Sequence, residues 1–192
     1  NAQWLKAGLE SEETKKFAVS VLNHMREKLI GYQMEYGNLY GLEATPAESA
    51  TFRFARLDRE RFSGIRTAGH EGDTPYYTNS TKLPADYDGT LQGALINQDS
   101  LQPLYTTGTV FHVYMERELE DWKKARDLLS SMITEHHIPC FTLSPVYTIC
   151  QTCGYLPGRQ ERCPKCNGAA DVYSRIAGYY RPVHDWNDGK AQ

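Results

Sequence analysis

The first third of the chain shows a helical spacing of apolar side chains. Between residues 12 and 36 an apolar residue recurs every four positions, at Phe17, Val21, Met25 and Leu29. This period is typical of an amphipathic helix with one face in a core. The sequence therefore predicts a helix over residues 12–36.

A second helix is predicted over residues 46–61 from a start signal. Thr45 precedes Pro46, and Glu48 stands at the third helical position. A threonine N-cap, a proline in the first turn and a glutamate at that position form a capping box. The next stretch, residues 63–91, contains glycine or proline at six positions. It is too interrupted for regular structure and too long for a passive connection, and long ordered loops are often functional.

The middle of the chain alternates between strand and helix patterns. Residues 107–115 are apolar enough for a strand buried on both faces, residues 116–136 show a helical stripe, and residues 138–143 predict a second short strand. A strand, a helix and a strand in this order are typical of a βαβ unit. We therefore expect an α/β fold with some parallel pairing.

Composition narrows the function classes. The 192 residues are 40% hydrophobic and 23% charged, with a formal net charge of -3. No apolar run approaches the ~18 residues that a membrane span needs. The acidic balance gives no electrostatic footprint for nucleic acid. We therefore expect no membrane or nucleic-acid partner and a cytoplasmic location. The missing initial methionine suggests a fragment or a processed chain.

Four of the five cysteines form two C-x-x-C pairs, namely Cys150, Cys153, Cys163 and Cys166. Two such pairs can offer four thiolates at tetrahedral corners, which favours a structural zinc ion. Gly154 after the first pair and Asn167-Gly168 after the second are typical of the turns required. A chance arrangement, a dithiol redox site and an iron centre are the alternatives. The fifth, Cys140, is expected to be a core residue on a strand, because free cysteine behaves as a small hydrophobe.

The sequence after the cysteines carries a resemblance to a known family. Residues 172–183 place Arg175, two further residues and then Gly178-Tyr179 downstream of a four-cysteine motif. This resembles the C-terminal glycyl-radical loop of the anaerobic (class III) ribonucleoside-triphosphate reductases. Further segments resemble the family's blocks in the family's order, at residues 45–49, 53–58, 76–80, 101–105 and 186–190.

The resemblance implies an architecture for the chain. Residues 1–144 would be the C-terminal part of the ten-stranded α/β barrel of glycyl-radical enzymes. Residues 145–170 would be a small zinc-ribbon-like module, and residues 171–192 the glycyl-radical loop with the start of a C-terminal tail. The cysteine that forms the thiyl radical would lie upstream of this chain, so the chain alone would be inactive.

The resemblance also implies a reaction and partners. The complete enzyme would convert ribonucleoside triphosphates to 2′-deoxyribonucleoside triphosphates, with the radical stored on Gly178. An α-carbon radical is stabilised in a planar geometry, and only glycine reaches it without a Cβ clash. A radical-SAM activase, with S-adenosylmethionine and a 4Fe-4S cluster, would install the radical. The reductant would be formate or a thiol protein, and the complete protein a homodimer.

Side chains around Gly178 are expected to protect it and to anchor its loop. The apolar cover would come from Ile176, Tyr179, Tyr180 and Val183. The two arginines, Arg175 and Arg181, would hold the ends of the loop.

Two places are candidates for substrate contacts. The predicted helix start offers backbone amides together with Thr45 and Ser49, which suits a phosphate group. A plain capped helix is the equal alternative, since Glu48 already uses part of that potential. The second place is Asn79-Ser80, for which an Asx turn is almost as good an explanation.

Two other kinds of function are compatible with parts of the sequence. A zinc-ribbon module could bind nucleic acid or protein without catalysis, through Arg159, Arg162, Lys165 and Arg175. Another glycyl-radical enzyme, such as a lyase or a formate acetyltransferase, would lack this zinc module.

Overall fold

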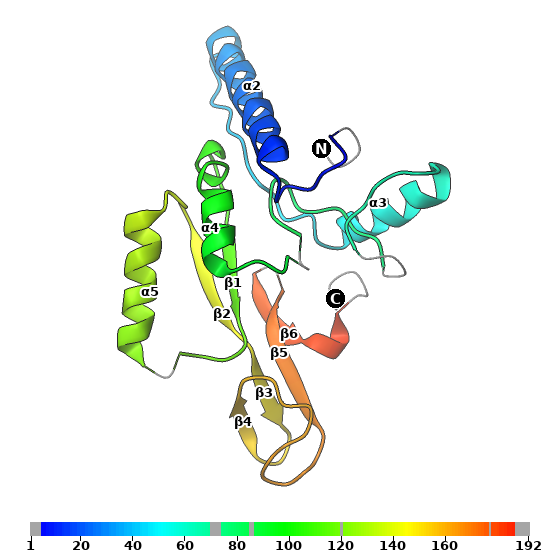
Figure 1. The fold of residues 1–192 in the computed structure, drawn as a ribbon, viewed down its shortest axis with the longest axis vertical. Coiled ribbons are helices and arrows are strands. Elements are labelled where there is room, and N and C mark those ends of the chain that lie inside the picture. Colours follow the sequence, from blue (N-terminus) through cyan, green and yellow to red (C-terminus); the bar gives the residue numbers. More distant parts are fainter. Residues whose placement is uncertain (1–4, 70–73, 85–86, 120, 177, 187–192) are drawn as a thin grey trace. The chain divides into compact units, whose positions relative to one another are not determined.

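The computed structural model describes residues 5–69, 74–84, 87–119, 121–176 and 178–186. It divides into two compact units (Figure 1). The first comprises residues 1–110 and 133–140, and the second residues 111–132 and 141–192. The three functional parts expected from the sequence, residues 1–144, 145–170 and 171–192, are a different kind of division and stay a prediction. No helix in the described ranges is long and apolar enough to cross a bilayer.

The first unit opens with α2, Glu12–Tyr36, which confirms the predicted helix residue for residue. Ser11 accepts a hydrogen bond from the backbone amide of Thr14, and Gly37 ends the helix with a φ of 70°. Glycine takes this left-handed conformation without a Cβ penalty. The buried face of α2 contributes Ala18 and Leu22 to a core cluster that also contains Leu101.

Helix α3, Glu48–Arg61, begins two residues later than predicted. Its N-cap is Ala47, with no side-chain cap bond, so the capping box on Thr45 is wrong. The backbone amide of Ala47 donates instead to Asn79 Oδ1 at 2.9 Å. A side chain from a distant loop thus does what a local capping residue was expected to do.

The sequence reading missed α4, Leu91–Asp99, and the short helix η1, Gln102–Leu104. Thr90 caps α4 by accepting from the Gly93 amide at 3.0 Å. Buried polar side chains from these helices, together with Thr109 downstream of them, form the polar network, defined as Asn97, Gln98, Gln102 and Thr109. This network lies next to the apolar core residue Leu101 in sequence.

The second unit contains the predicted βαβ unit. Strand β1, Phe111–Met115, pairs in parallel with β2, Phe141–Pro145, and most of α5, Trp122–Glu135, belongs to this unit. The parallel pairing confirms the predicted topology, but all three elements are shorter or shifted. The helix begins late because Asp121 Oδ1 accepts from the Lys123 amide at 2.8 Å.

Cys140 is exposed, so its assignment as a strand core residue is wrong. The strand starts one residue later, at Phe141. A side chain in the loop before a strand has no sheet face to bury it. His112 on β1 is half-buried, with Nδ1 and Thr142 Oγ1 2.8 Å apart across the β1–β2 pair.

The cysteine and glycine segments fold into one antiparallel four-stranded sheet. Its strands are β3, Tyr147–Cys150; β4, Gly154–Pro157; β5, Ala170–Ile176; and β6, Tyr179–Pro182, followed by the helix η2, Val183–Asp185. The strand order is β4-β3-β5-β6, so β5 lies between β3 and β6 (Figure 1). The sequence reading had assigned none of these strands.

Candidate metal centre and glycine hairpin

The first cysteine pair lies in the β3–β4 hairpin. Cys150 is the last residue of β3 and pairs with Gly154, the first residue of β4. Gly154 has a φ of 78°, which lets the chain turn sharply after Cys153. The Cys153 amide donates to Cys150 Sγ at 3.4 Å. The turn therefore presents two sulfur atoms from one short segment.

The second pair forms a similar turn in the loop before β5. The Asn167 amide donates to the Cys163 carbonyl at 2.8 Å, and the Cys163 amide to the Gly168 carbonyl at 2.9 Å. Asn167 has a φ of 57°, a conformation that asparagine tolerates better than most residues. Both predicted turns are thus present, each with its glycine or asparagine in use.

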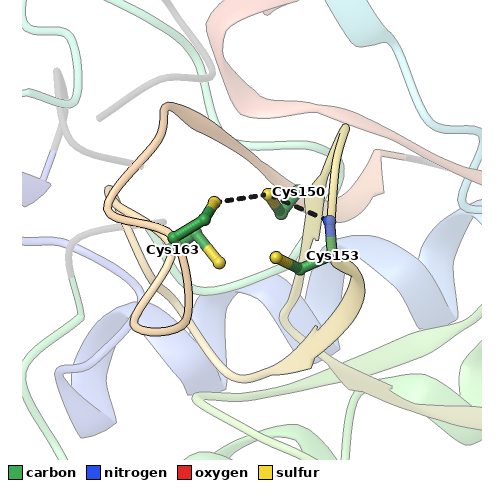
Figure 2. A group of neighbouring side chains, drawn as sticks. Cys150, Cys153 and Cys163 are labelled. Carbon is green, nitrogen blue, oxygen red and sulfur yellow. Dashed lines mark hydrogen bonds between the residues drawn. The ribbon is translucent and has the colours of Figure 1, made fainter.

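The two turns bring all four sulfur atoms together. The Sγ atoms of Cys150, Cys153, Cys163 and Cys166 lie within 4.8 Å of one another, and no pair is a disulfide. Figure 2 shows Cys150, Cys153 and Cys163 directed toward one another. The Cys150 and Cys166 sulfurs are 3.6 Å apart. Zn–S bonds of about 2.3 Å at tetrahedral angles would place sulfurs roughly 3.8 Å apart. The cluster can therefore hold a metal ion, and its donor set and spacing fit zinc.

The thiols of this group differ in acidity. Hydrogen bonding to the Cys166 thiol, aided by burial, raises the pKa of Cys153 to about 12. Burial also raises the pKa of Cys163, but the backbone amides of Cys166 and Lys165 outweigh it, and the pKa falls to about 6. Amides directed at a sulfur stabilise the thiolate, which is the form that binds metal.

Few apolar residues support these turns. Cys150, Leu156 and Cys163 are the buried members of the local cluster. The buried Thr148 hydroxyl donates to the Gly158 carbonyl at 2.8 Å and accepts from the Gln160 amide at 3.0 Å. A metal ion would therefore contribute much of the order of this segment, because so little apolar surface is buried here.

Gly178 lies at the tip of the β5–β6 hairpin. Ile176 ends β5 and pairs with Tyr179, which begins β6. Gly178 is exposed, its φ lies outside the left-handed region, and no heavy atom comes within 4 Å of the position of an added Cβ. Neither backbone conformation nor space within the described chain requires a glycine here.

The expected surroundings of Gly178 are present only in part. Arg175 places its guanidinium 5.7 Å from the centre of the Tyr180 ring. Tyr179 is 58% exposed and gives little cover, and the side chain of Ile176 lies outside the described part. Arg181 Nε lies 3.9 Å from Asp185 Oδ2 in an exposed pair, which contributes little. Within the described residues, the predicted apolar cover of Gly178 is not seen.

The substrate candidates come together around the start of α3. Asn79 binds the Ala47 amide there, Thr45 and Ser80 are exposed, and the Ser49 side chain lies outside the described part. Ser80 has a φ of 50°. It also lines an open cleft of ≈ 1480 Å³ in the first unit, and the same cleft is lined by the cationic residues Lys6, Arg59 and Arg66.

The sequence reading missed one feature of the second unit. Tyrosines from all four strands of the sheet contact one another, at positions 147, 155, 173 and 180. The high tyrosine content was visible, but the contacts depend on strands that the reading had not assigned.

A cysteine cluster that can hold a metal ion lies on one sheet with a glycine hairpin, and together with the βαβ unit these parts define a mixed α/β protein. The family model described as "Anaerobic ribonucleoside-triphosphate reductase" matches residues 2–192. The chain belongs to this family.

Individual relatives agree with the family match. The chain is similar to the anaerobic ribonucleoside-triphosphate reductases of Haemophilus influenzae, 24% identical over 179 residues, and of Escherichia coli, 22% identical over 179 residues. Both alignments cover 88% of this chain, but 25% and 24% of the respective relative. The chain thus spans about a quarter of the length of these curated relatives.

Solved structures support the fold. A Thermotoga maritima anaerobic ribonucleotide reductase with dATP bound in its specificity site superposes with a TM-score of 0.70 at 23% identity, over 92% of this chain and 28% of that one. Another anaerobic ribonucleotide reductase gives a TM-score of 0.75 at 22% identity, over 95% of this chain and 28% of that one.

Proposed function

We propose that this chain is the C-terminal part of an anaerobic ribonucleotide reductase, and that it stores the enzyme's radical on Gly178. The complete enzyme converts ribonucleoside triphosphates to 2′-deoxyribonucleoside triphosphates. The observation that carries the proposal is that one sheet holds both parts. Cys150 ends β3, and Gly178 stands at the tip of the hairpin formed by β5 and β6.

The four cysteines hold a structural zinc ion in this proposal. The sulfurs are mutually close, and four thiolates leave no open position for substrate or water. The ion supplies the order that the small apolar cluster around Leu156 cannot supply. The role is therefore to fix the turns at the end of the sheet, and not to take part in the reaction.

Gly178 suits radical storage for a chemical reason. Loss of one α-hydrogen atom leaves an unpaired electron that is delocalised over both flanking peptide groups when the centre is planar. Among the residues that the structure describes, an added Cβ at this position would meet nothing within 4 Å, so packing there does not explain a glycine. The exposed tip also makes the α-hydrogen accessible to the radical-SAM activase, whose S-adenosylmethionine and 4Fe-4S cluster provide the oxidising radical.

The rest of the machinery comes from outside this chain. The parallel β1–β2 pair and its helix form part of the ten-stranded α/β barrel. The thiyl cysteine lies in the upstream sequence, the complete protein is a homodimer, and formate or a thiol protein supplies the reducing equivalents. The upstream part also shields Gly178, which is exposed in the described chain. The cytoplasmic location stays a prediction.

The phosphate groups of the substrate have a suitable environment near α3. Its N-terminus presents backbone amides, and Thr45 is exposed beside it. Lys6, Arg59 and Arg66 line the cleft that also contains Ser80. The Asn79 side chain accepts a hydrogen bond from the Ala47 amide, so its role is to hold the shape of this site.

The decisive experiment uses the full-length protein after anaerobic activation. An unpaired electron on Gly178 couples to the one remaining α-hydrogen, so electron paramagnetic resonance should show a doublet. Incorporation of α-deuterated glycine should collapse the doublet. Gly178→Ala should abolish the signal with unchanged metal content.

A matched control is available in α2. Gly31 is exposed, and an added Cβ would meet nothing within 4 Å. Gly31→Ala should therefore keep the doublet. A doublet that survives Gly178→Ala would rule out the assignment.

A further inference from the structure

Four tyrosines, one from each strand, lie on one face of the sheet, and three of them are in ring contact with the fourth, Tyr147. The tyrosine row is defined as Tyr155 of β4, Tyr147 of β3, Tyr173 of β5 and Tyr180 of β6. The ring centroid of Tyr147 lies 5.8 Å from that of Tyr155, 5.4 Å from that of Tyr173 and 5.2 Å from that of Tyr180. The Tyr147 and Tyr173 rings are stacked with an interplanar angle of 2°. Tyr147 is therefore the centre of the row.

The pairing register explains why these rings share a face. Tyr147 pairs directly with Tyr173, and paired residues point to the same side of a sheet. Two residues after Tyr173 comes Arg175, which pairs with Tyr180. Alternation along the strand thus puts Arg175 and Tyr180 on the face of the row.

The same strand connects the row to the cysteines. Tyr147 begins β3 and Cys150 ends it, three residues later and so on the opposite face. Any order that a metal ion gives to Cys150 is therefore transmitted along a strand of four residues to Tyr147. Strand β3 therefore has a residue of the tyrosine row at one end and a residue of the cysteine cluster at the other.

The contact between Tyr147 and Tyr180 reaches across a strand. The backbone of β6 is hydrogen-bonded to β5 and not to β3. The ring contact at 5.2 Å thus joins two strands that the backbone leaves apart. Tyr180 is two residues from Gly178. The guanidinium of Arg175 lies 5.7 Å from the centroid of the Tyr180 ring. Burial raises the pKa of the Tyr147 hydroxyl, so the ring stays uncharged at neutral pH.

We propose that Tyr147 is a positioning residue for the Gly178 hairpin, and that it couples the order of the cysteine module to β6 through its ring contact with Tyr180. The proposal assigns a function to the face of the sheet opposite the cysteines. Its meaning for catalysis rests on the proposed radical storage at Gly178, but the coupling itself is a property of the sheet.

The test measures amide hydrogen exchange in the full-length protein, with metal bound and after chelation. Exchange of the amides of residues 179–181 reports how often the hairpin opens locally. Metal content is measured in parallel on every sample. The test variants are Tyr147→Ala and Tyr147→Leu, of which the second keeps an apolar side chain on β3 but has no ring. Tyr147→Phe keeps the ring and removes only the hydroxyl.

The structure offers a matched control at the far end of the row. Tyr155 on β4 contacts the ring of Tyr147 and is 48% exposed. Among the described residues it has no ring contact with Tyr180. Tyr155→Ala removes a tyrosine of the same row and leaves the Tyr147–Tyr180 contact in place. It should leave exchange in β6 near the original rate.

The expected result is a loss of coupling. With metal bound, Tyr147→Ala and Tyr147→Leu should each speed exchange in residues 179–181 by about threefold to tenfold, which lies within the range expected for one lost aromatic pair. Chelation should speed it in the original protein, and should add little in these variants, because the connection is already broken. Tyr147→Phe should behave as the original protein does.

Three results would overturn the proposal. The first is β6 exchange in metal-loaded Tyr147→Leu within about twofold of the original rate, which is below the effect of an aromatic pair. The second is an equal increase in Tyr155→Ala, and the third is a full chelation effect in the Tyr147 variants. If Tyr147→Ala loses its metal, the Leu variant decides.

A second readout separates this proposal from the assignment of the radical. After anaerobic activation, metal-loaded Tyr147→Leu should give a lower yield of the glycyl doublet than Tyr147→Phe. No doublet in any variant, the original protein included, would contradict the proposed function. The exchange result would stand in that case, because it requires no radical.

Discussion

Two regions of this chain reach order by different means. In the cysteine module, residues 150–168, the buried cluster comprises Cys150, Leu156 and Cys163. In the first unit, Leu83 of the segment 74–84 packs against the core cluster of Leu101, and Gln98 of the polar network donates to the Thr81 carbonyl. In the first region, a metal ion can join the four sulfur atoms. In the second region, side-chain amides form hydrogen bonds with groups of the protein itself. We therefore expect the order of the first region to depend on a metal ion and that of the second to be independent of it.

The polar network shows how buried hydrogen bonds can specify the position of a loop. Gln98 Nε2 donates to the Thr81 carbonyl at 2.9 Å, and Gln102 Nε2 donates to Gln98 Oε1 at 2.6 Å. Thr109 in turn donates to Gln102, and Asn97 donates to the Leu9 carbonyl at 2.9 Å. A chain of satisfied buried polar groups specifies one arrangement, since any break leaves a group unpaired.

Metal removal should give the largest effect and tests the comparison directly. Chelation, or Cys163→Ser, should unfold the β3–β4 hairpin and the loop to β5, because structural zinc supplies about 10–16 kcal/mol of apparent binding free energy in small zinc domains. Hydrogen exchange measured by segment would become fast in residues 147–170 and would stay unchanged in residues 91–105. Cys140→Ser, at an exposed cysteine outside the cluster, should change neither metal content nor exchange. Full protection of the module without metal would contradict the comparison.

Breaking the polar network should give the next largest effect. Gln102→Leu leaves the Gln98 acceptor and the Thr109 donor unpaired, at about 1–3 kcal/mol for each buried group. A lower urea midpoint and faster exchange around Thr81 are expected, with metal content unchanged. Gln92→Leu, at an exposed glutamine, is the control. Loss of the metal in Gln102→Leu would show that the two regions do not order independently.

Removal of the Asn79 side chain should have a smaller effect. Asn79→Ala leaves the Ala47 amide without its acceptor, and the loss of such a capping contact costs about 1 kcal/mol. A modest fall in melting temperature and faster exchange in the first turn of α3 are expected. Asn38→Ala, at an exposed asparagine, should cause no change. Equal melting temperatures for both variants would show that the contact carries no free energy.

The smallest effect concerns Asp99 and its dependence on pH. Burial alone would raise the pKa of Asp99, but hydrogen bonds and charge from His137, with His136 nearby, lower it below 3.8. A lowered carboxyl pKa contributes stability that is present above the unfolded value and is lost as pH falls through the folded one. The urea midpoint of Asp99→Asn should therefore lie below the original at neutral pH, and the gap should close in acid. A gap of constant size would contradict this.

The sequence predicted features that depend on nearby residues better than features that depend on residues far away in the chain. The spacing of Phe17, Val21 and Met25 is local, and α2 has the predicted bounds, but Val21 and Met25 are exposed, so the predicted core face was wrong in part. The cysteine cluster was also predictable, because each C-x-x-C turn is complete within a few residues. The start of α3 was wrong because Asn79, more than thirty residues away in sequence, binds the amide of Ala47.

Other features depended on partners that the sequence does not reveal. Helix α4 was missed because Gly93 weakens its helical pattern, although Thr90 was available as a cap. Cys140 was misplaced because strand ends cannot be read to one residue from an apolar run. The strands β3 to β6 are four to seven residues long, and their apolar alternation is too short to distinguish from loop.

The position of Gly178 at a hairpin tip has a consequence for repair after damage. A backbone break there would leave all four cysteines on the upstream piece, so that piece would retain its metal-binding set. It would separate β6 covalently from β5, and departure of β6 would turn β5 into an edge strand with unpaired backbone groups. Such an edge accepts an added strand, so a short separate polypeptide that supplies a new β6 with its own glycine could restore the sheet.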